Sequence, residues 1–284
     1  MMAPSSAILS YDWLELSARC AASLGELLAA TPQRDDRVAE TGTIGAGGDR
    51  TLVIDEQAEE IVFAELKKLF DAGARFTALS EERGTVDFGS DEAFVVIDPI
   101  DGSLNAKRGL PAYSISIAVA DGPTMADVGF GFVHDFGSDE QWHAVCGAGA
   151  WLNGQPLAPV APERRSEDGR LEVVLVEGAS PFNLAASTPA LIAGAHRVRA
   201  FGSMAISCCQ VAAGRADAMV SLWSCRPVDI AASQLVVREA GGEVAFPAAD
   251  SPLELPLADS DCVSAIVAAP SAAALADALS FPAL

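Results

Sequence analysis

Apolar residues recur at helical spacing in two segments of the first third of the chain. One segment spans residues 11–30 and carries Leu14, Ala18, Ala21 and Leu28 among polar residues. The other begins at Asp55 and places its apolar residues on one stripe: Ala58, Ile61, Val62, Leu66, Leu69 and Phe70. Residues three and four positions apart share one face of a helix, so both segments are predicted to be amphipathic helices. Residues 41–48 between them are rich in glycine and predict a mobile loop.

Short apolar runs predict strands in the region that follows. Phe76–Leu79 is one, and Ala93–Ile97 is an unbroken run of branched and aromatic residues, as expected of a strand buried on both faces. In Tyr113–Val119 apolar and small residues alternate, which predicts a half-buried strand. Two more strands are expected at residues 127–133 and 140–146, and Asn153-Gly154 predicts a tight hairpin turn.

Strands and helices alternate in the second half of the chain. Strands are predicted at residues 171–176, 216–222 and 263–268, and helices at residues 203–213 and 229–240, with one more helix near the end. The segment Pro159–Gly169 is rich in proline and charge and marks a boundary. We therefore expect an α+β part at residues 1–165 and an α/β part at residues 166–284, packed as one compact layered α/β sandwich.

Composition narrows the classes of partner. The chain has 284 residues, 50% of them hydrophobic, which is ample for a large core. Its formal net charge of −21 repels nucleic acid and anionic membranes, so neither is an expected partner. No signal peptide or bilayer-length apolar run is evident, and the six cysteines form no C-x-x-C pair. These features predict a cytoplasmic protein with reduced thiols, rather than disulfides or a zinc site.

The most informative motif directly follows the run Ala93–Ile97. It reads Asp98-Pro99-Ile100-Asp101-Gly102-Ser103, so the chain leaves a buried strand and at once presents two carboxylates. Pro99 stiffens the bend, Gly102 allows a backbone angle that other residues avoid, and Ser103 is a good helix N-cap. Because two acidic groups at a buried strand end repel each other, we expect a cation between them, most simply a divalent metal ion.

Three other acidic features lie at strand exits or helix entrances, where α/β proteins place their sites. They are Asp49 with Asp55, the pair Glu81-Glu82, and Asp229 after Arg226-Pro227. A structural role is open for each, because Asp55 and Asp229 can cap helices and Glu81-Glu82 can form a solvated turn. Taken with Asp98 and Asp101, they form a set of hard oxygen ligands that suits Mg²⁺ better than zinc.

Other catalytic patterns are absent from the sequence. No histidine accompanies a G-x-S-x-G serine, and no P-loop motif occurs. Gly147-Ala148-Gly149 lacks the rest of a dinucleotide fingerprint and is better explained by a hairpin. Arg199, Arg215 and Arg226 are interpreted as surface or structural residues, with one of them able to reach a substrate anion.

Taken together and in order, these segments resemble the inositol monophosphatase/fructose-1,6-bisphosphatase superfamily over residues 14–269. The resemblance rests on a Gly-Asp-x-Thr-x-x-x-Asp segment ending at Asp55, the Ser80-Glu81-Glu82 step, the motif at residues 98–105 and the helix start at residues 228–232. Ser103 with Asn105 is closest to the archaeal-type dual-substrate members. The resemblance implies an αβαβα sandwich that assembles as a homodimer.

The resemblance also implies roles for individual residues around two or three Mg²⁺ ions. Glu81, Asp98 and the carbonyl of Ile100 would hold one ion, and Asp98, Asp101 and Asp229 a second. A third would involve Glu81 and the glycine-rich loop. Asp55 would pair with Ser103 and, with Glu81, help to activate water. The substrate side would consist of Gly102, Ser103, Gly202, Met204 and Arg226.

The implied function is a Mg²⁺-dependent phosphomonoesterase that acts on a small phosphorylated polyol or sugar, such as inositol monophosphate or fructose 1,6-bisphosphate. The glutamate that animal inositol enzymes place near Ser221 is missing, and Val228 replaces a common tryptophan, so a sugar phosphate is favoured. Two alternatives stay open: a 3′-phosphoadenosine 5′-phosphate phosphatase of the same superfamily, and a non-catalytic homologue that binds a metal or ligand.

Overall fold

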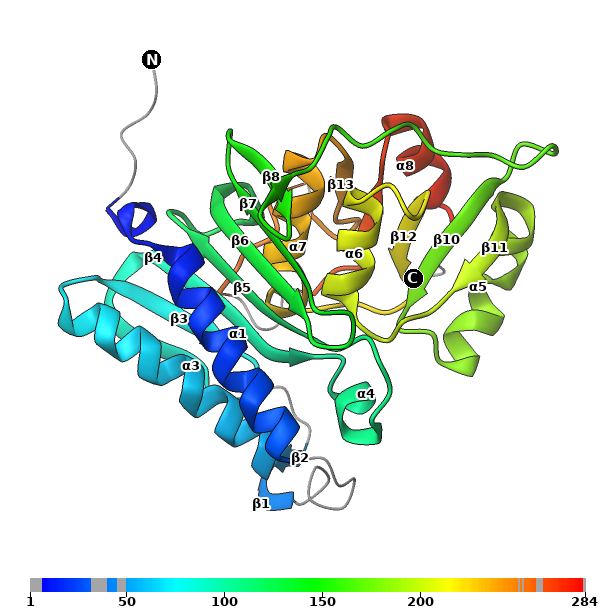
Figure 1. The fold of residues 1–284 in the computed structure, drawn as a ribbon. Helices are drawn as coiled ribbons and strands as arrows, with labels where there is room; N and C mark the ends of the chain where they lie inside the picture. The colour runs from blue at the N-terminus through cyan, green and yellow to red at the C-terminus, as the bar shows by residue number, and fades with distance from the viewer. Residues whose placement is uncertain are drawn as a thin grey trace.

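A computed structural model describes residues 7–31, 40–44, 50–249, 251, 253–258 and 263–282. Its chain forms alternating layers of helices and sheets (Figure 1). Helices α1 (Trp13–Ala30) and α3 (Val53–Asp71) form the first layer, as the apolar spacing predicted. Their apolar faces pack on one side of the large sheet, where Leu24, Val62 and Leu66 are buried beside Phe76 and Ile117.

Part of the glycine-rich region between these helices forms a strand. Strand β1 (Glu40–Ile44) pairs antiparallel with β2 (Arg50–Leu52). The prediction of a mobile loop is therefore wrong for residues 41–44, whose backbone is held by the ladder. Residues 45–49, including Asp49, lie outside the described residues.

The second layer is a seven-stranded sheet in the order β3-β4-β5-β6-β7-β8-β9. Its strands are β3 (Phe76–Ser80), β4 (Gly84–Asp101), β5 (Ser114–Ala120), β6 (Val128–Asp135), β7 (Glu140–Val145), β8 (Gly149–Leu152) and β9 (Gln155–Pro156). Asn153 and Gly154 both have positive φ and form the predicted hairpin turn between β8 and β9. Every residue of β5 is buried, so the half-buried prediction is wrong, because helices cover both faces of the sheet.

The remaining layers follow from the second half of the chain. Helices α6 (Met204–Ala212) and α7 (Pro227–Glu239) lie between the two sheets, where Cys209, Leu235 and Val236 share a core with Val96 and Ile266. The second sheet has the order β11-β10-β12-β14-β13. Its strands are β10 (Leu171–Glu177), β11 (Ala195–Arg199), β12 (Ala218–Ser221), β13 (Glu243–Ala245) and β14 (Val267–Ala269).

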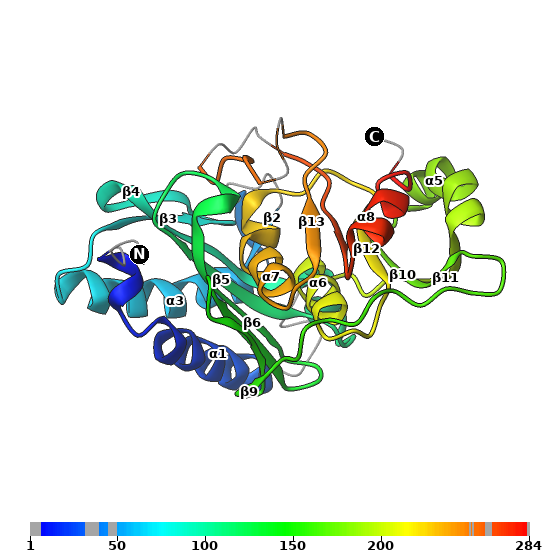
Figure 2. The same ribbon diagram turned by 90° about the horizontal axis from the view of Figure 1, so that it is seen from above.

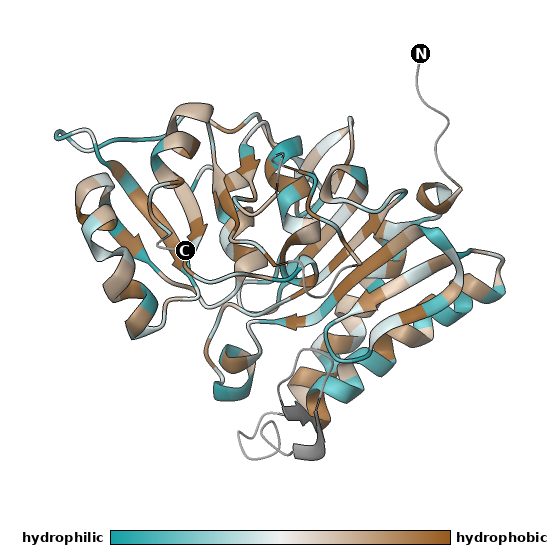
Figure 3. Cartoon of the chain, turned by 180° about the vertical axis from the view of Figure 1, so that it is seen from behind, coloured by the Kyte–Doolittle hydropathy of each residue, from teal (hydrophilic) through white to brown (hydrophobic). Residues whose placement is uncertain are grey.

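Helices α5 (Pro181–Gly194) and α8 (Ala272–Ala278) cover the outer face of the second sheet, which completes the αβαβα sandwich (Figure 2). Apolar residues follow the strands, while the outer surfaces of the first-layer helices are largely polar (Figure 3). The last strand of the first sheet, β9, and the first strand of the second, β10, are separated by residues 157–170. A division of the chain into two parts at residue 165 stays a prediction. None of the described helices is long and apolar enough to cross a membrane.

Candidate active site

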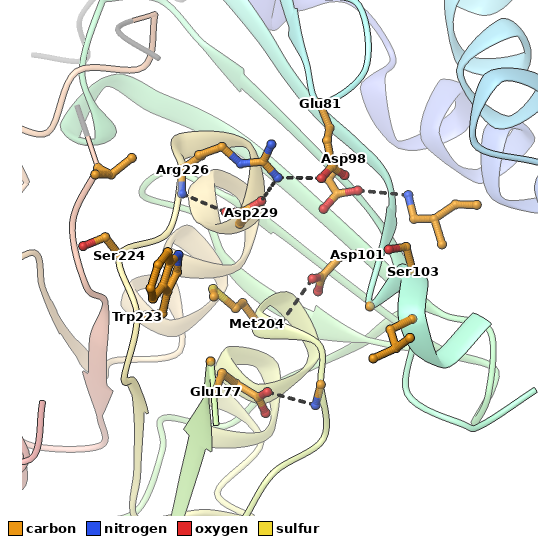
Figure 4. Close-up of a pocket in the computed structure, with 16 residues that line it drawn as sticks. Glu81, Asp98, Asp101, Ser103, Glu177, Met204, Trp223, Ser224, Arg226 and Asp229 are labelled. Carbon is orange, nitrogen blue, oxygen red and sulfur yellow. Dashed lines mark hydrogen bonds and ion pairs between the residues drawn. The ribbon is translucent and has the colours of Figure 1, made fainter. Parts of the chain in front are cut away.

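A cavity of about 620 Å³ opens where β4, the turn after β3, β10 and the N-terminal ends of α6 and α7 meet (Figure 4). The motif at the end of β4 forms one wall. Asp98 lies opposite Ser116 of β5 and Asp101 opposite Ser114, so β4 carries one extra residue between the two pairs. Such a bulge re-aims the side chains beside it, and here both carboxylates line the cavity.

Gly102 turns the chain from β4 into the short helix α4 (Ser103–Arg108). Its φ is +83°, and a Cβ at this position would lie 2.8 Å from the carbonyl oxygen of Ala112 and 2.9 Å from that of Gly202. Both the backbone angle and the crowding therefore require glycine here. Gly102 itself occupies the N-cap position and Ser103 is the first helical residue, so the prediction that Ser103 caps the helix is wrong.

Asp101 joins β4 to the start of α6. Its carboxylate accepts hydrogen bonds from the hydroxyl of Ser203, from the amide of Ala205 at 2.9 Å and from the amide of Met204 at 3.3 Å. Ser203 also caps α6 by accepting a hydrogen bond from the amide of Ile206. Burial raises the pKa of Asp101 to about 7, against the opposing effect of these donors.

Arg226 links two more of the acidic residues that line the cavity. Its Nη2 lies 2.6 Å from Oε1 of Glu81 and 3.0 Å from Oδ1 of Asp229. The other carboxylate oxygen of Asp229 accepts from the backbone amide of Arg226 at 2.7 Å, at the start of α7. Asp229 therefore completes a capping box at the start of α7, the structural role that the sequence left open, and it also lines the cavity, where its role as a metal ligand stays a prediction.

Glu59, a buried glutamate on α3, holds the turn that carries Glu81. The carboxylate of Glu59 accepts from the hydroxyl of Ser80 and from the amides of Glu82 and Arg83, and it pairs with Nε of Arg83 at 3.0 Å. These bonds hold the turn after β3 on both sides of Glu81. Of the predicted pair, Glu81 lines the cavity and Glu82 does not.

Negative charge is concentrated in this cavity. Asp98 is 2% exposed, and burial raises its pKa well above the ordinary range. The carboxylates of Glu81, Asp101 and Asp229 add to this effect, while Arg226 opposes it. A buried carboxylate among three others is unfavourable unless a cation compensates for it.

The donor chemistry fits a hard divalent cation, because every acidic ligand offers oxygen and none of the three histidines lines the cavity. As the side chains stand, however, no group of three His, Cys, Asp or Glu residues within the described ranges is arranged to hold an ion. Arg226 instead neutralises two of the carboxylates. Ion binding through Glu81 and Asp229 would therefore require their pairing with Arg226 to open.

The structure brings most of the predicted site residues into this one cavity. They are Glu81, Asp98, Ile100, Asp101, Gly102, Ser103, Gly202, Met204, Arg226 and Asp229. Asp55 is not among the residues that line it. The carboxylate of Asp55 is buried on α3, 3.5 Å from the ammonium of Lys107, so its role and its pairing with Ser103 stay predictions.

Comparison with known proteins agrees with the geometry. The sequence model that defines the inositol monophosphatase family matches residues 12–279 of this chain. The chain belongs to the inositol monophosphatase family. A fructose-1,6-bisphosphatase/inositol-1-monophosphatase of Thermococcus kodakarensis is 32% identical over 237 residues, which are 83% of this chain and 84% of that protein. The Nus factor SuhB of Pasteurella multocida is 33% identical over 239 residues, 81% and 84% of the two chains.

A solved structure of this family extends the match to the fold. An inositol monophosphatase–fructose 1,6-bisphosphatase superposes with a TM-score of 0.78 at 28% identity, covering 95% of this chain and all of the other. As a member of the inositol monophosphatase family, the chain is a phosphatase of this superfamily.

Six residues that sequence reasoning missed also line the cavity of this family member: Leu104, Glu177, Gly178, Trp223, Ser224 and Val263. Glu177 ends β10 and is followed by a glycine, the same arrangement that drew attention to Asp101 and Gly102. It accepts from the amides of Phe201 and Gly202, both at 2.9 Å, and from the hydroxyl of Ser207. An acidic residue at a buried strand end was therefore a usable signal, whereas nothing in the sequence set Trp223 apart.

Proposed function

We propose that this protein is a Mg²⁺-dependent phosphomonoesterase acting on a small phosphorylated sugar or polyol. The observation that carries the proposal is the convergence of four carboxylates from three distant segments on one cavity, which Glu177 also lines. They are Glu81, Asp98, Asp101 and Asp229. Neither helix capping nor solubility explains why Asp98 is buried among the other three.

One set of cavity residues would hold the ions in this proposal. It consists of Glu81, Asp98, Asp101, Asp229 and the carbonyl of Ile100. Bound Mg²⁺ would supply positive charge for the phosphate and lower the pKa of a water molecule. Asp101 needs little reorganisation for this task, because donors of β5 and α6 already hold its carboxylate.

The substrate phosphate would lie beside this carboxylate cluster. The backbone amides of Gly102 and Ser103, where the chain turns into α4, would receive its oxygens. Arg226 is the one arginine or lysine lining the cavity within the described residues, and its guanidinium can form charge-assisted hydrogen bonds to a phosphate. We propose that Arg226 exchanges Glu81 and Asp229 for the phosphate when ions and substrate bind together.

The substrate class follows from size, charge and relatives. A cavity of about 620 Å³ accommodates a small ester. The name of the Thermococcus kodakarensis relative specifies fructose 1,6-bisphosphate and inositol 1-phosphate hydrolysis. We propose the same pair of esters as first substrates here, with the sugar phosphate favoured by the missing glutamate near Ser221.

Location and assembly are part of the proposal. Cys20, Cys146, Cys208, Cys209 and Cys225 are all free thiols. Since disulfides form in oxidising compartments, free thiols support a cytoplasmic location. We also propose a homodimer, which sedimentation of the purified protein would test.

The direct test measures phosphate release from a panel of esters with Mg²⁺ and with a chelator. The panel contains fructose 1,6-bisphosphate, inositol 1-phosphate, glycerol 2-phosphate and adenosine 3′,5′-bisphosphate. Asp98→Asn and Asp229→Asn should lower turnover at least about a thousandfold while circular dichroism stays unchanged. Glu82→Gln is the matched control, because Glu82 neighbours Glu81 but does not line the cavity.

Three outcomes would contradict the proposal. Wild-type turnover in either Asn variant would refute the assigned ligands. Preference for the adenine compound would favour the 3′-phosphoadenosine 5′-phosphate phosphatase alternative. Metal binding by calorimetry without hydrolysis of any ester would favour the non-catalytic homologue.

A further inference from the structure

Trp223 belongs to the wall of the cavity and is also largely exposed to solvent. It lines the cavity of the candidate active site, yet its side chain is 63% exposed. Trp13 and Trp142, by contrast, are buried in the core at 2% and 0% exposure. A large aromatic ring left in water at the edge of a binding cavity is available to a ligand.

The backbone of Trp223 is fixed, although its ring is exposed. The preceding residue, Leu222, donates from its amide to the carbonyl of Glu177 at 2.7 Å. Two residues later, the amide of Cys225 donates to the carbonyl of Ser264 at 2.8 Å. Gly178 packs so closely that a Cβ there would lie 2.6 Å from the Cβ of Trp223. The ring therefore projects from a rigid base and would lose little backbone freedom when a ligand binds.

The Trp223 ring and the charged side chains of the cavity together would orient a bound phosphate ester. In Figure 4, Trp223 and Met204 lie on one side of the cavity, and Asp98, Asp101 and Ser103 lie on the other. A phosphate held among the carboxylates and Arg226 would direct the alcohol part of its ester towards Trp223. Val263, another apolar residue, also lines the cavity. Ser224, next to Trp223, adds a hydroxyl to this wall, so the part of the substrate that reaches the Trp223 ring itself should present an apolar face.

We propose that Trp223 is a specificity-determining residue that stacks on the ring of a cyclic sugar or cyclitol phosphate. One face of such a ring carries C–H groups, which match the electron-rich face of an indole. An acyclic polyol phosphate has no such face. This inference rests on the proposed phosphatase function and adds that ring-bearing esters are selected over acyclic ones.

The test compares Trp223→Ala and Trp223→Phe with the wild type. With fructose 1,6-bisphosphate or inositol 1-phosphate, Trp223→Ala should raise KM about tenfold and change kcat less than about twofold. With glycerol 2-phosphate, which has no ring, KM should not change. Trp223→Phe should restore most of the lost affinity. Phe182→Ala is the matched control, since Phe182 is an 82% exposed aromatic residue outside the cavity.

Several results would overturn the inference. An equal rise in KM for cyclic and acyclic esters would mean that Trp223 shapes the cavity rather than stacks. An effect confined to adenosine 3′,5′-bisphosphate would assign the ring to a nucleobase instead.

A binding measurement separates this inference from the proposed function. If the wild type hydrolyses no ester, the proposed function fails, and a fluorescence titration with the same cyclic esters still decides the stacking. If the esters quench the tryptophan fluorescence of the wild type but not that of Trp223→Phe, the result supports stacking on Trp223. Equal quenching of the fluorescence of both proteins overturns the inference.

Discussion

The guanidinium of Arg226 lies 2.6 Å from the carboxylate of Glu81, a residue 145 positions away in the sequence. The same nitrogen pairs with Asp229, so one arginine neutralises two of the carboxylates that we propose as metal ligands. A positive charge at this distance competes with a divalent ion for the same oxygens. It also stabilises the cavity while no ion is bound.

Removal of this internal cation should therefore have opposite effects on stability and on ion affinity. Without Mg²⁺, Arg226→Gln should lower the free energy of unfolding by on the order of 2 kcal/mol, because two ion pairs are lost and the carboxylates repel one another. The increase in Tm on adding Mg²⁺ should then exceed that of the wild type. Thermal unfolding and calorimetric Mg²⁺ titration check both effects, with exposed Arg197→Gln as control. A smaller Mg²⁺-induced increase in Tm in Arg226→Gln than in the wild type would contradict the competition between Arg226 and Mg²⁺ for these carboxylates.

The buried carboxylate of Asp101 predicts a dependence of stability on pH. Its pKa is raised from 3.8 to about 7, chiefly by burial. A raised pKa in the folded state means that the group contributes stability below its unfolded pKa, and that this contribution is lost as the pH rises through about 7. The Tm of the metal-free protein should therefore fall between pH 5 and pH 8.

Bound Mg²⁺ should oppose this fall, because protons and the ion compete for the same carboxylates. The Mg²⁺-induced increase in Tm should grow with pH over the same range. Thermal scans in a chelator and in Mg²⁺ would measure both trends. In Asp101→Asn the slope without metal should be shallower, and an unchanged slope would assign the titration to another group.

Glu59 should influence the site through the turn that carries Glu81. In Glu59→Gln the amide nitrogen would face donors that now reach the carboxylate, so the free energy of unfolding should fall by about 2 kcal/mol. The Mg²⁺ concentration for half-maximal activity should rise, with kcat at saturating Mg²⁺ close to that of the wild type. Glu60→Gln, exposed on the same helix, should change neither. Lower stability with an unchanged Mg²⁺ requirement would make Glu59 purely structural.

Two glycines with positive φ allow steric contact to be separated from backbone strain. Gly102 and Gly109 lie at φ +83° and +67°, but a Cβ at Gly109 would meet nothing within 4 Å. Gly109→Ala should therefore cost about 1 kcal/mol of folding free energy, from the backbone angle alone. Gly102→Ala should cost about 3 kcal/mol and strongly reduce activity, because it pushes against the carbonyls of Ala112 and Gly202. Urea unfolding measures the free energy of unfolding of both variants. Equal decreases would show that the steric contact with the carbonyls of Ala112 and Gly202 does not destabilise Gly102→Ala.

Local patterns in the sequence predicted the elements that carry a strong periodic signal. The stripes of α1 and α3 and the apolar run ending at Ile97 are all where we expected them. Helix α5 was not predicted, because it is alanine-rich, contains Pro189 and has no clear polar face. Strand β11 was also missed: it carries charged residues on an edge, and its pairing with β10 is a contact between distant segments.

The sequence by itself determined which side chains can take part in the chemistry. The carboxylates of Asp98 and Asp101, the bend at Pro99 and the need for glycine at position 102 are all encoded within six residues. Only the tertiary structure decided that Arg226 pairs with Glu81, that Glu59 supports the turn beside it and that Trp223 faces the cavity. These relationships join residues that are far apart in the chain, so they depend on how the layers pack and leave no periodic pattern in the sequence.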